Sequence, residues 1–146
     1  KAYEEMGAFK IYFFDTGLLK CMSGVENESI ILNKPFAFKG AITENFVLQQ
    51  LVAIMHNNPF YYTFERYEVD FLIQHLGEII PIEVKAGESV AGNSLNKYRD
   101  RYTPSLAIRY SMLNLDIQNG FINIPLYFAG RTLDILKTNK EGVDFH

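Results

Sequence analysis

The chain has 146 residues, a formal net charge of −3 and one cysteine. That length allows one domain with a real core, and 48% hydrophobic with 21% charged residues excludes a disordered chain. A lone Cys21 excludes an internal disulfide and a cysteine zinc site, and it favours the reducing cytoplasm. No apolar run approaches the roughly 20 residues of a membrane helix, so no membrane partner is expected. The negative charge argues against a dedicated nucleic-acid binder but not against a local basic patch.

A short acidic turn is the first motif along the chain. Residues 9–14 are apolar and aromatic, which predicts a short strand. Asp15-Thr16-Gly17 matches the aspartic-protease tripeptide, but such a site needs two of these loops and the chain has one. We therefore interpret Asp15 as a helix N-cap or turn residue before Leu18. Residues 20–35 predict a loop with a single helical turn.

A long helix is predicted from about Lys39 to His56, ended by Asn57-Asn58-Pro59. Glu44 falls on its predicted buried stripe rather than on its wet face. A carboxylate on such a stripe needs a partner or a metal ion. The alternative is a first-turn Glu that is favoured by the helix dipole and only half-buried. The stripe consists of Ala41, Glu44, Leu48, Leu51 and Met55.

A β-hairpin forms the centre of the predicted domain. After a strand at residues 60–64, two strands are expected at about 68–75 and 79–85, with a tight turn at Leu76-Gly77. Regular alternation would place the acidic and basic residues of the hairpin on one face and its apolar residues on the other. The polar set is Asp70, Glu83 and Lys85, and the apolar set is Val69, Phe71, Ile73, Ile80, Ile82 and Val84.

The position of the turn decides which residues face each other. A loop at Leu76-Gly77 sets Asp70 opposite Glu83, whereas a loop at Gly77-Glu78 sets Asp70 opposite Lys85. Facing Cβ atoms lie about 5 Å apart. Two carboxylates at that separation repel by about 3 kcal/mol at an effective dielectric near 20. A divalent cation removes this penalty, and hard oxygen ligands suit Mg²⁺ or Mn²⁺.

The remaining chain predicts alternating helices and strands. Residues 86–94 nearly match a phosphate-binding P-loop, but Asn93 stands where a lysine is required and Glu88 would repel phosphate. We interpret this segment as a connection. The expected elements are a helix over about 94–101, a strand over 106–111, a turn over 116–120, a strand over 121–124, a final helix from Pro125 to about Lys137, and a frayed tail from Thr138.

The acidic hairpin resembles a known nuclease signature. Asp70, followed by Glu83-Val84-Lys85 on the next strand, is similar to the Asp…Glu-x-Lys signature of the PD-(D/E)XK nuclease superfamily. A wider match, over about residues 8–128, resembles the C-terminal domain of unknown function that follows the ATPase core in many bacterial and archaeal AAA-type ATPases. The matching segments are 10–19, 39–47, 68–71, 81–85, 94–95 and 124–127.

This resemblance implies the fold class and the domain organisation. The expected class is α/β, with a mixed β-sheet flanked by helices, as in restriction-endonuclease-like PD-(D/E)XK proteins. Residues 1–38 would be an N-terminal extension leading from an upstream ATPase region that this sequence lacks, 39–137 the nuclease-like domain and 138–146 a tail. The ATPase core of the same polypeptide is then the expected partner.

The resemblance also implies a role for each site residue. Asp70, Glu83 and the carbonyl group of Val84 would hold Mg²⁺ or Mn²⁺, and Glu44 would support the metal directly or through water. Lys85 would orient or deprotonate the attacking water. Lys97 and Arg101, one turn apart on the following helix, are candidate nucleic-acid contacts.

Two functions follow from these residues. The first is Mg²⁺-dependent hydrolysis of DNA or RNA phosphodiesters, which makes the four residues Glu44, Asp70, Glu83 and Lys85 catalytic. The alternative is a catalytically silent binding or regulatory module that gives the ATPase its partner specificity. Taken singly, the charged strand residues indicate only a solvated face with a surface ion pair.

Overall fold

The computed structural model describes residues 7, 9–32, 36, 38–87 and 93–141. Its helices and strands follow one another as α1 (Thr16–Met22), α2 (Asn27–Ile31), α3 (Lys39–Met55), β1 (Phe60–Phe64), β2 (Tyr67–His75), β3 (Glu78–Val84), α4 (Asn93–Tyr102), β4 (Ala107–Ser111), β5 (Asp116–Gln118), β6 (Phe121–Pro125), the 3₁₀ helix η1 (Leu126–Arg131) and α5 (Thr132–Glu141). No helix in these ranges combines the length and the apolarity needed to cross a membrane.

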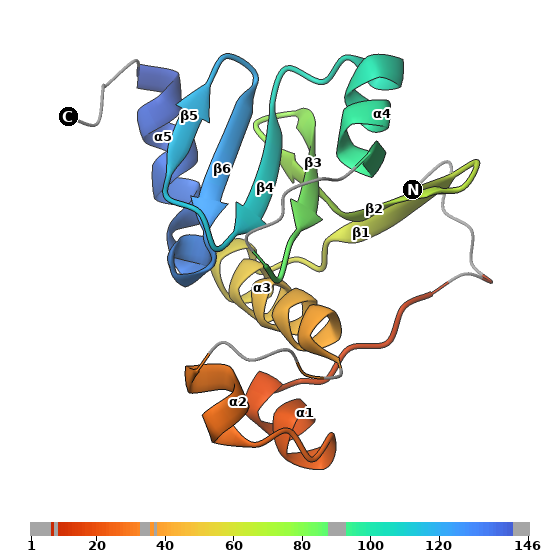
Figure 1. Ribbon diagram of the computed structural model, residues 1–146. Helices are drawn as coiled ribbons and strands as arrows, with labels where there is room; N and C mark the ends of the chain where they lie inside the picture. The colour runs from red at the N-terminus through yellow and green to blue at the C-terminus, as the bar shows by residue number, and fades with distance from the viewer. Residues whose placement is uncertain (1–6, 8, 33–35, 37, 88–92, 142–146) are drawn as a thin grey trace.

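The strands form one mixed sheet in the order β1-β2-β3-β4-β6-β5 (Figure 1). The β1–β2–β3 meander is antiparallel, β3–β4 and β4–β6 are parallel, and β5 is antiparallel to β6. The two parallel steps need crossovers, which α4 and the β5 hairpin provide. The predicted α/β class with a mixed sheet flanked by helices is confirmed.

The main core lies between the sheet and the helices α3 and α5. Val47 and Leu51 of α3 and Leu136 of α5 are buried there against alternate residues of the strands. The strand residues in this cluster are Phe71, Ile73, Ile80, Ile82, Ile108, Tyr110, Ile122 and Ile124. A smaller cluster of Phe64, Val69 and Tyr98 joins α4 to the opposite face. We call these the α3 face and the α4 face.

The predicted hairpin register is confirmed. Phe71 pairs with Ile82 and His75 with Glu78, so the loop is Leu76-Gly77 and not Gly77-Glu78. Both loop residues have positive φ, 51° for Leu76 and 85° for Gly77. This is the backbone of a type I′ turn, which matches the twist of the flanking strands.

The predicted alternation along β2 is wrong at one point. Phe60 pairs with Leu72 but Tyr62 pairs with Val69, so β2 contains one residue more than β1 across this stretch. The extra residue is a β-bulge at Asp70 and Phe71, which reverses the alternation. Val69 therefore packs against Tyr98 on the α4 face, whereas Phe71 joins the main core on the α3 face.

Several other expected elements differ from the structure. Residues 9–14 are extended but form no described strand, because the Phe13 N–H donates to a side chain of α3. The expected turn at 116–120 contains the short strand β5, and Pro125 ends β6 instead of opening a helix. The final helix reaches Glu141, so the tail expected from Thr138 is helical to that residue. Ala41 is exposed, and Asn45 lies on the buried side of α3 instead.

Candidate functional site

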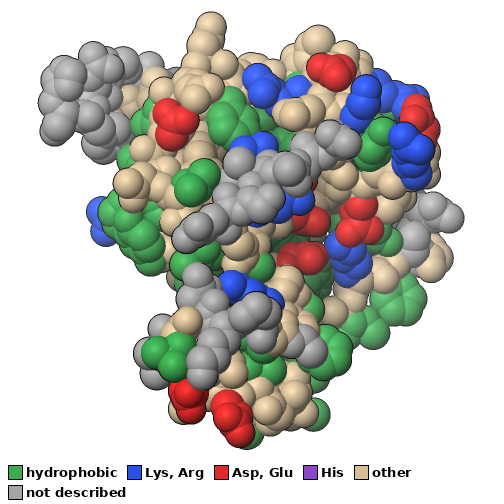
Figure 2. All heavy atoms as spheres, in the orientation of Figure 1, with side chains coloured by type: hydrophobic (Ala, Val, Ile, Leu, Met, Phe, Trp, Pro, Cys, Tyr) green, Lys and Arg blue, Asp and Glu red, His purple; other side chains and the backbone are tan. Residues whose placement is uncertain are grey.

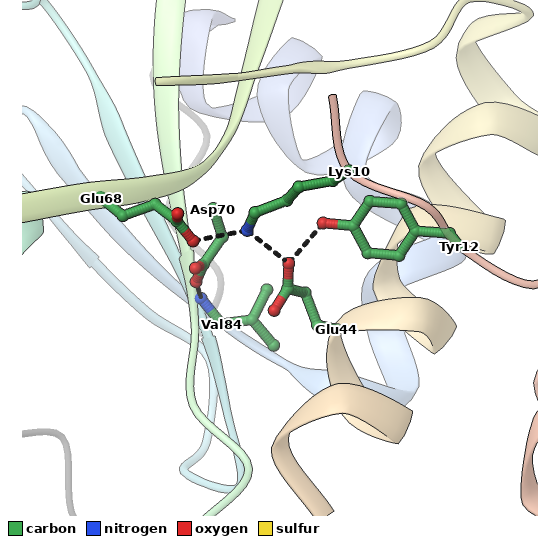
Figure 3. Close-up of polar contacts among 6 residues, drawn as sticks. All are labelled: Lys10, Tyr12, Glu44, Glu68, Asp70 and Val84. Carbon is green, nitrogen blue, oxygen red and sulfur yellow. Dashed lines mark hydrogen bonds and ion pairs between the residues drawn. The ribbon is translucent and has the colours of Figure 1, made fainter. Parts of the chain in front are cut away.

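A lysine from the N-terminal segment lies at the centre of the acidic site. Lys10 Nζ lies 3.1 Å from Glu44 Oε1 on α3 and also pairs with Glu68 Oε1 on β2. Figure 3 shows its ammonium group between these two carboxylates. Burial lowers the pKa of Lys10, but the hydrogen bonds and charges of Glu68 and Glu44 outweigh this effect and raise it. Lys10 is therefore the resident cation of the cluster.

Glu44 faces the hairpin, as its position on the helix predicted. Its side chain is 23% exposed, and Oε1 also accepts a hydrogen bond from the Tyr12 hydroxyl group. Burial, followed by the hydrogen bond and charge of Glu44, raises the pKa of Tyr12. The phenol thus stays protonated and remains a donor. Glu44 is half-buried and already has two partners from the N-terminal segment.

Side-chain amides of α3 hold that segment in place. The buried Asn45 accepts from the Phe13 N–H at 2.8 Å and donates to Thr16 Oγ1 at 3.0 Å. Gln49 accepts from the N–H and hydroxyl groups of Thr16. Asp15 caps α1 by accepting from the Leu18 N–H at 2.8 Å, which confirms its predicted capping role. Lys10 and Tyr12 are thereby fixed against the sheet.

Asp70 lies beside Glu44 and Lys10 rather than beside Glu83. Its Oδ2 accepts a hydrogen bond from the Val84 N–H at 2.7 Å (Figure 3). The side-chain carboxylate of Asp70 therefore replaces a backbone carbonyl group as the acceptor between β2 and β3. Burial, together with the charges of Glu44 and then Glu83, raises its pKa from 3.8 to about 6, although the Val84 N–H and Lys10 oppose the rise. Buried carboxyl groups with a strongly raised pKa are common at functional sites.

Glu83 points to the α4 face, where basic residues surround it. It is 4% exposed, with Oε1 3.0 Å from Lys85 Nζ and Oε2 3.7 Å from Arg109 Nε. Ile82 is in the main core and Val84 packs against it, so alternation turns Glu83 away from that core. The expectation that Asp70 shares a face with Glu83 and Lys85 is wrong. The bulge in β2 is the reason, because it brings Asp70 to the α3 face.

These positions do not fit the four-ligand metal site that the resemblance implies. The oxygen ligands suit Mg²⁺ or Mn²⁺, and Glu83 Oε2 is buried with no hydrogen-bond partner among the described residues. Yet no three His, Cys, Asp or Glu side chains in the described ranges come together as a metal site. Asp70 and Glu44 lie on one side of the sheet, and Glu83 lies on the other. The ammonium group of Lys10 already supplies the positive charge between the carboxylates of Glu44 and Glu68.

The predicted nucleic-acid contacts lie away from the acidic cluster. Lys97 and Arg101 are both exposed on α4, and Figure 2 shows Lys and Arg side chains gathered over this helix. Arg101 pairs with Glu65 at 3.1 Å and stacks on the Tyr102 ring. Its charge is therefore partly neutralised by a neighbouring acid, while Lys97 extends into solvent.

Four residues of the site were missed in the sequence, namely Lys10, Tyr12, Glu68 and Arg109. Lys10 and Tyr12 are two positions apart in an extended segment, so they point the same way while Ile11 points outward at 81% exposure. That spacing was a usable signal. Arg109 alternates with Ile108 and Tyr110, which places it on the face opposite the core. Nothing local in the sequence indicated that Glu83 would be its neighbour.

The fold and the site together define a class of protein. It is a mixed α/β domain whose acidic and basic residues cluster around one bulged hairpin. A family model matches residues 39–128, which is more than half of the chain, and its description is "Domain of unknown function (DUF4143)". The chain belongs to this family.

Two curated relatives extend the comparison. They are uncharacterized proteins of Mycobacterium bovis and Mycobacterium tuberculosis, each 33% identical over 105 residues. The match covers 69% of this chain but 23% of each relative, so the chain spans about a quarter of their length. No solved structure matches.

Proposed function

We propose that the chain is a binding and regulatory module with a nuclease-like arrangement of residues, silent in hydrolysis because its own cations neutralise its acids. The observation that carries this proposal is the pairing of Glu44 and Glu68 with Lys10, and of Glu83 with Lys85 and Arg109. A divalent ion would have to displace an ammonium group held by two carboxylates. The bulge also keeps the acids on two sides of the sheet.

The N-terminal segment supplies the surface for binding. Lys10 and Tyr12 point inward, whereas Phe9, Ile11 and Phe14 are 73%, 81% and 95% exposed. A row of exposed apolar side chains on an anchored segment is typical of an interaction surface. The partner that we propose is the ATPase core of a longer polypeptide, because the relatives are about four times as long as the matched region. In that polypeptide, Ile11→Ser should weaken the association between the two parts, whereas the exposed Leu113→Ser should not.

A second candidate function, Mg²⁺-dependent hydrolysis of DNA or RNA, is favoured by one observation. Asp70 is buried near Glu44, and its pKa is raised to about 6. Structural stability does not explain this arrangement, because burial beside Glu44 makes the ionised carboxylate of Asp70 unfavourable even with Lys10 nearby. Should Lys10 leave the cluster, the carboxylates of Glu44, Glu68 and Asp70 would remain as oxygen ligands for a divalent ion.

One experiment separates the two functions. Mn²⁺ is titrated by calorimetry into the wild-type chain and into Asp70→Asn, and both are assayed on plasmid and single-stranded DNA and RNA at low salt. A silent module gives no cleavage and nearly identical Mn²⁺ titrations. Cleavage that requires Mn²⁺ and is abolished by Asp70→Asn would refute the proposal and establish the second function.

The matched control is Asp116→Asn. Asp116 is an exposed acid on β5 whose Oδ2 accepts from Gln118, so it lies outside the cluster. Its substitution removes the same charge as Asp70→Asn. A difference between the two variants therefore reports on the position of Asp70 and not on net charge.

A further inference from the structure

A hollow of about 330 Å³ lies on the α4 face, apart from the Lys10 cluster. Side chains from α4, from β4 and β6, and from the segment between these strands line it, among them Asn96, Arg99, Arg109, Asn114 and Phe121. Because Ile108 and Ile122 face the main core, Arg109 and Phe121 face the opposite side of the sheet. The hollow therefore combines cationic, amide and aromatic groups.

Two guanidinium groups stack on one aromatic ring in this hollow. The central carbon of Arg109 lies 5.0 Å from the Phe121 ring centroid, and that of Arg99 lies 5.5 Å from it. At these distances both groups are within cation–π range of the ring, and their N–H groups can still act as donors. Two like charges held at one ring repel each other. An anion bound in the hollow by both groups would reduce that repulsion.

The internal partners of these arginines are incomplete. Arg109 Nε is buried and lacks a hydrogen-bond partner among the described residues. Its ion pair with Glu83, at 3.7 Å, is too long for a hydrogen bond, and Glu83 is shared with Lys85 at 3.0 Å. Within the described part of the chain, Arg99 forms no ion pair. Both arginines thus keep donors for a ligand.

Hydrogen bonds of Asn123 hold the segment that lines one side of the hollow. The amide group of Asn123 donates to the carbonyl oxygens of Leu113 and Asn114 and accepts from Ser111, which fixes the segment after β4. Among the described residues, the one acid lining the hollow is Asp116, whose Oδ2 accepts from Gln118 at 2.7 Å. Arg99, Arg109 and Lys85 together carry three positive charges beside the two carboxylates of Asp116 and Glu83, so the surroundings of the hollow are cationic.

We propose that this hollow binds a phosphate-type oxyanion, free or as a terminal phosphomonoester, through Arg99 and Arg109. A guanidinium group presents two parallel N–H donors to phosphate oxygens, which suits this ligand better than a single-point contact does. The side-chain amide groups of Asn96 and Asn114 lie at the rim and supply neutral donors. The site does not require a metal ion and is independent of the acidic cluster.

The test titrates inorganic phosphate into the ¹⁵N-labelled chain at constant pH and ionic strength, followed by NMR. The expected result is saturable shifts of the amide signals of α4, β4 and β6. Arg99→Met should weaken binding about tenfold or more, because it removes a charged hydrogen bond. Arg131→Met is the control, since Arg131 is an exposed arginine paired with Asp134. Shifts that do not saturate, or equal binding by Arg99→Met, would overturn the proposal.

Two further measurements complete the test. Because Arg109 is nearly buried, Phe121→Leu serves as the second variant: it removes the stacking ring and should also weaken phosphate binding, while its circular dichroism spectrum checks folding. A nucleoside monophosphate is titrated in parallel with phosphate. Tighter binding of the nucleotide identifies a phosphomonoester as the ligand, and equal binding identifies the free anion.

Discussion

At the scale of single residues, Asp70 and Lys10 determine the character of the site. The bulge holds Asp70 against the Val84 N–H, near Glu44, where a carboxylate is electrostatically unfavourable. Lys10 offsets part of this cost by pairing with Glu44 and Glu68. Each of the two residues leads to a measurable consequence.

Asp70→Asn should stabilise the protein at neutral pH. The folded-state pKa of Asp70 is raised from 3.8 to about 6, so the folded state binds a proton more tightly than the unfolded state does. Protonated Asp70 is therefore more compatible with the folded state than the ionised form is. This stabilisation is fully present below pH 4 and is lost as the pH rises to 6. The variant should gain about 1–3 kcal/mol at pH 7 and nothing near pH 3.5. Urea unfolding between pH 3.5 and 7.5 measures this; a gain that does not vary with pH would contradict the assignment.

Lys10→Met should expose the acidic cluster to divalent ions. The variant leaves Glu44, Glu68 and Asp70 without their ammonium group, and Mn²⁺ can then replace it. Millimolar Mn²⁺ should raise the melting temperature of Lys10→Met by several degrees and leave the wild type almost unchanged. The control is Lys97→Met, an exposed lysine on α4. Equal responses of the two variants would show that Lys10 does not compete with metal ions.

At the scale of elements, the β2–β3 hairpin is fixed by its turn. Leu76 and Gly77 both have positive φ, which determines the register, whereas the bulge determines which face Asp70 reaches. The turn and the bulge thus have separate effects on the site.

Leu76→Asn should stabilise the hairpin. Leucine is unfavourable at φ 51°, and Leu76 is 68% exposed, so its side chain contributes little packing. Asparagine tolerates this conformation and is preferred before glycine in a type I′ turn. We expect a gain of about 0.5–1 kcal/mol in thermal or urea unfolding. Leu76→Ala, which keeps the strain, should give no gain.

At the scale of the whole molecule, the domain is larger than the segment matched by the family model. Residues of η1 and α5 beyond residue 128 close the main core on the α3 face, with Ala129, Ile135 and Leu136 all buried. The N-terminal segment is bound to the middle of α3 through Asn45 and Gln49. Both flanks therefore belong to one folded unit.

A chain that ends after Phe128 should be largely unfolded. It lacks Ile135 and Leu136, and each buried side chain of this kind contributes about 2–5 kcal/mol. That loss approaches the whole stability of an ordinary domain, about 5–15 kcal/mol. Circular dichroism and urea unfolding of the shortened chain measure it, beside a chain that ends after Glu141. A cooperative transition of unchanged midpoint would show that α5 is dispensable.

From the sequence alone, the α/β class, the register of the hairpin and the elements from α3 to β4 could be predicted, whereas β5 and the start of the last helix could not. The predictable features depend on local patterns: the three- and four-residue spacing in α3, the alternation along the strands and the glycine at Gly77. Asp15 as a cap and Glu44 as a residue facing the hairpin could also be predicted, because each depends on its own helix. The sequence also identified Glu44, Asp70, Glu83 and Lys85 as candidate site residues.

Only the tertiary structure decided how these residues meet. The bulge at Asp70 appears only in the pairing of β2 with β1, which the alternation along β2 did not predict. Lys10 reaches Glu44 across 34 positions of sequence, and Glu83 meets Arg109 because β3 and β4 are parallel neighbours. Such contacts depend on packing between distant segments. Sequence patterns fix the direction of a side chain within its own element, but its partners depend on where the other elements pack.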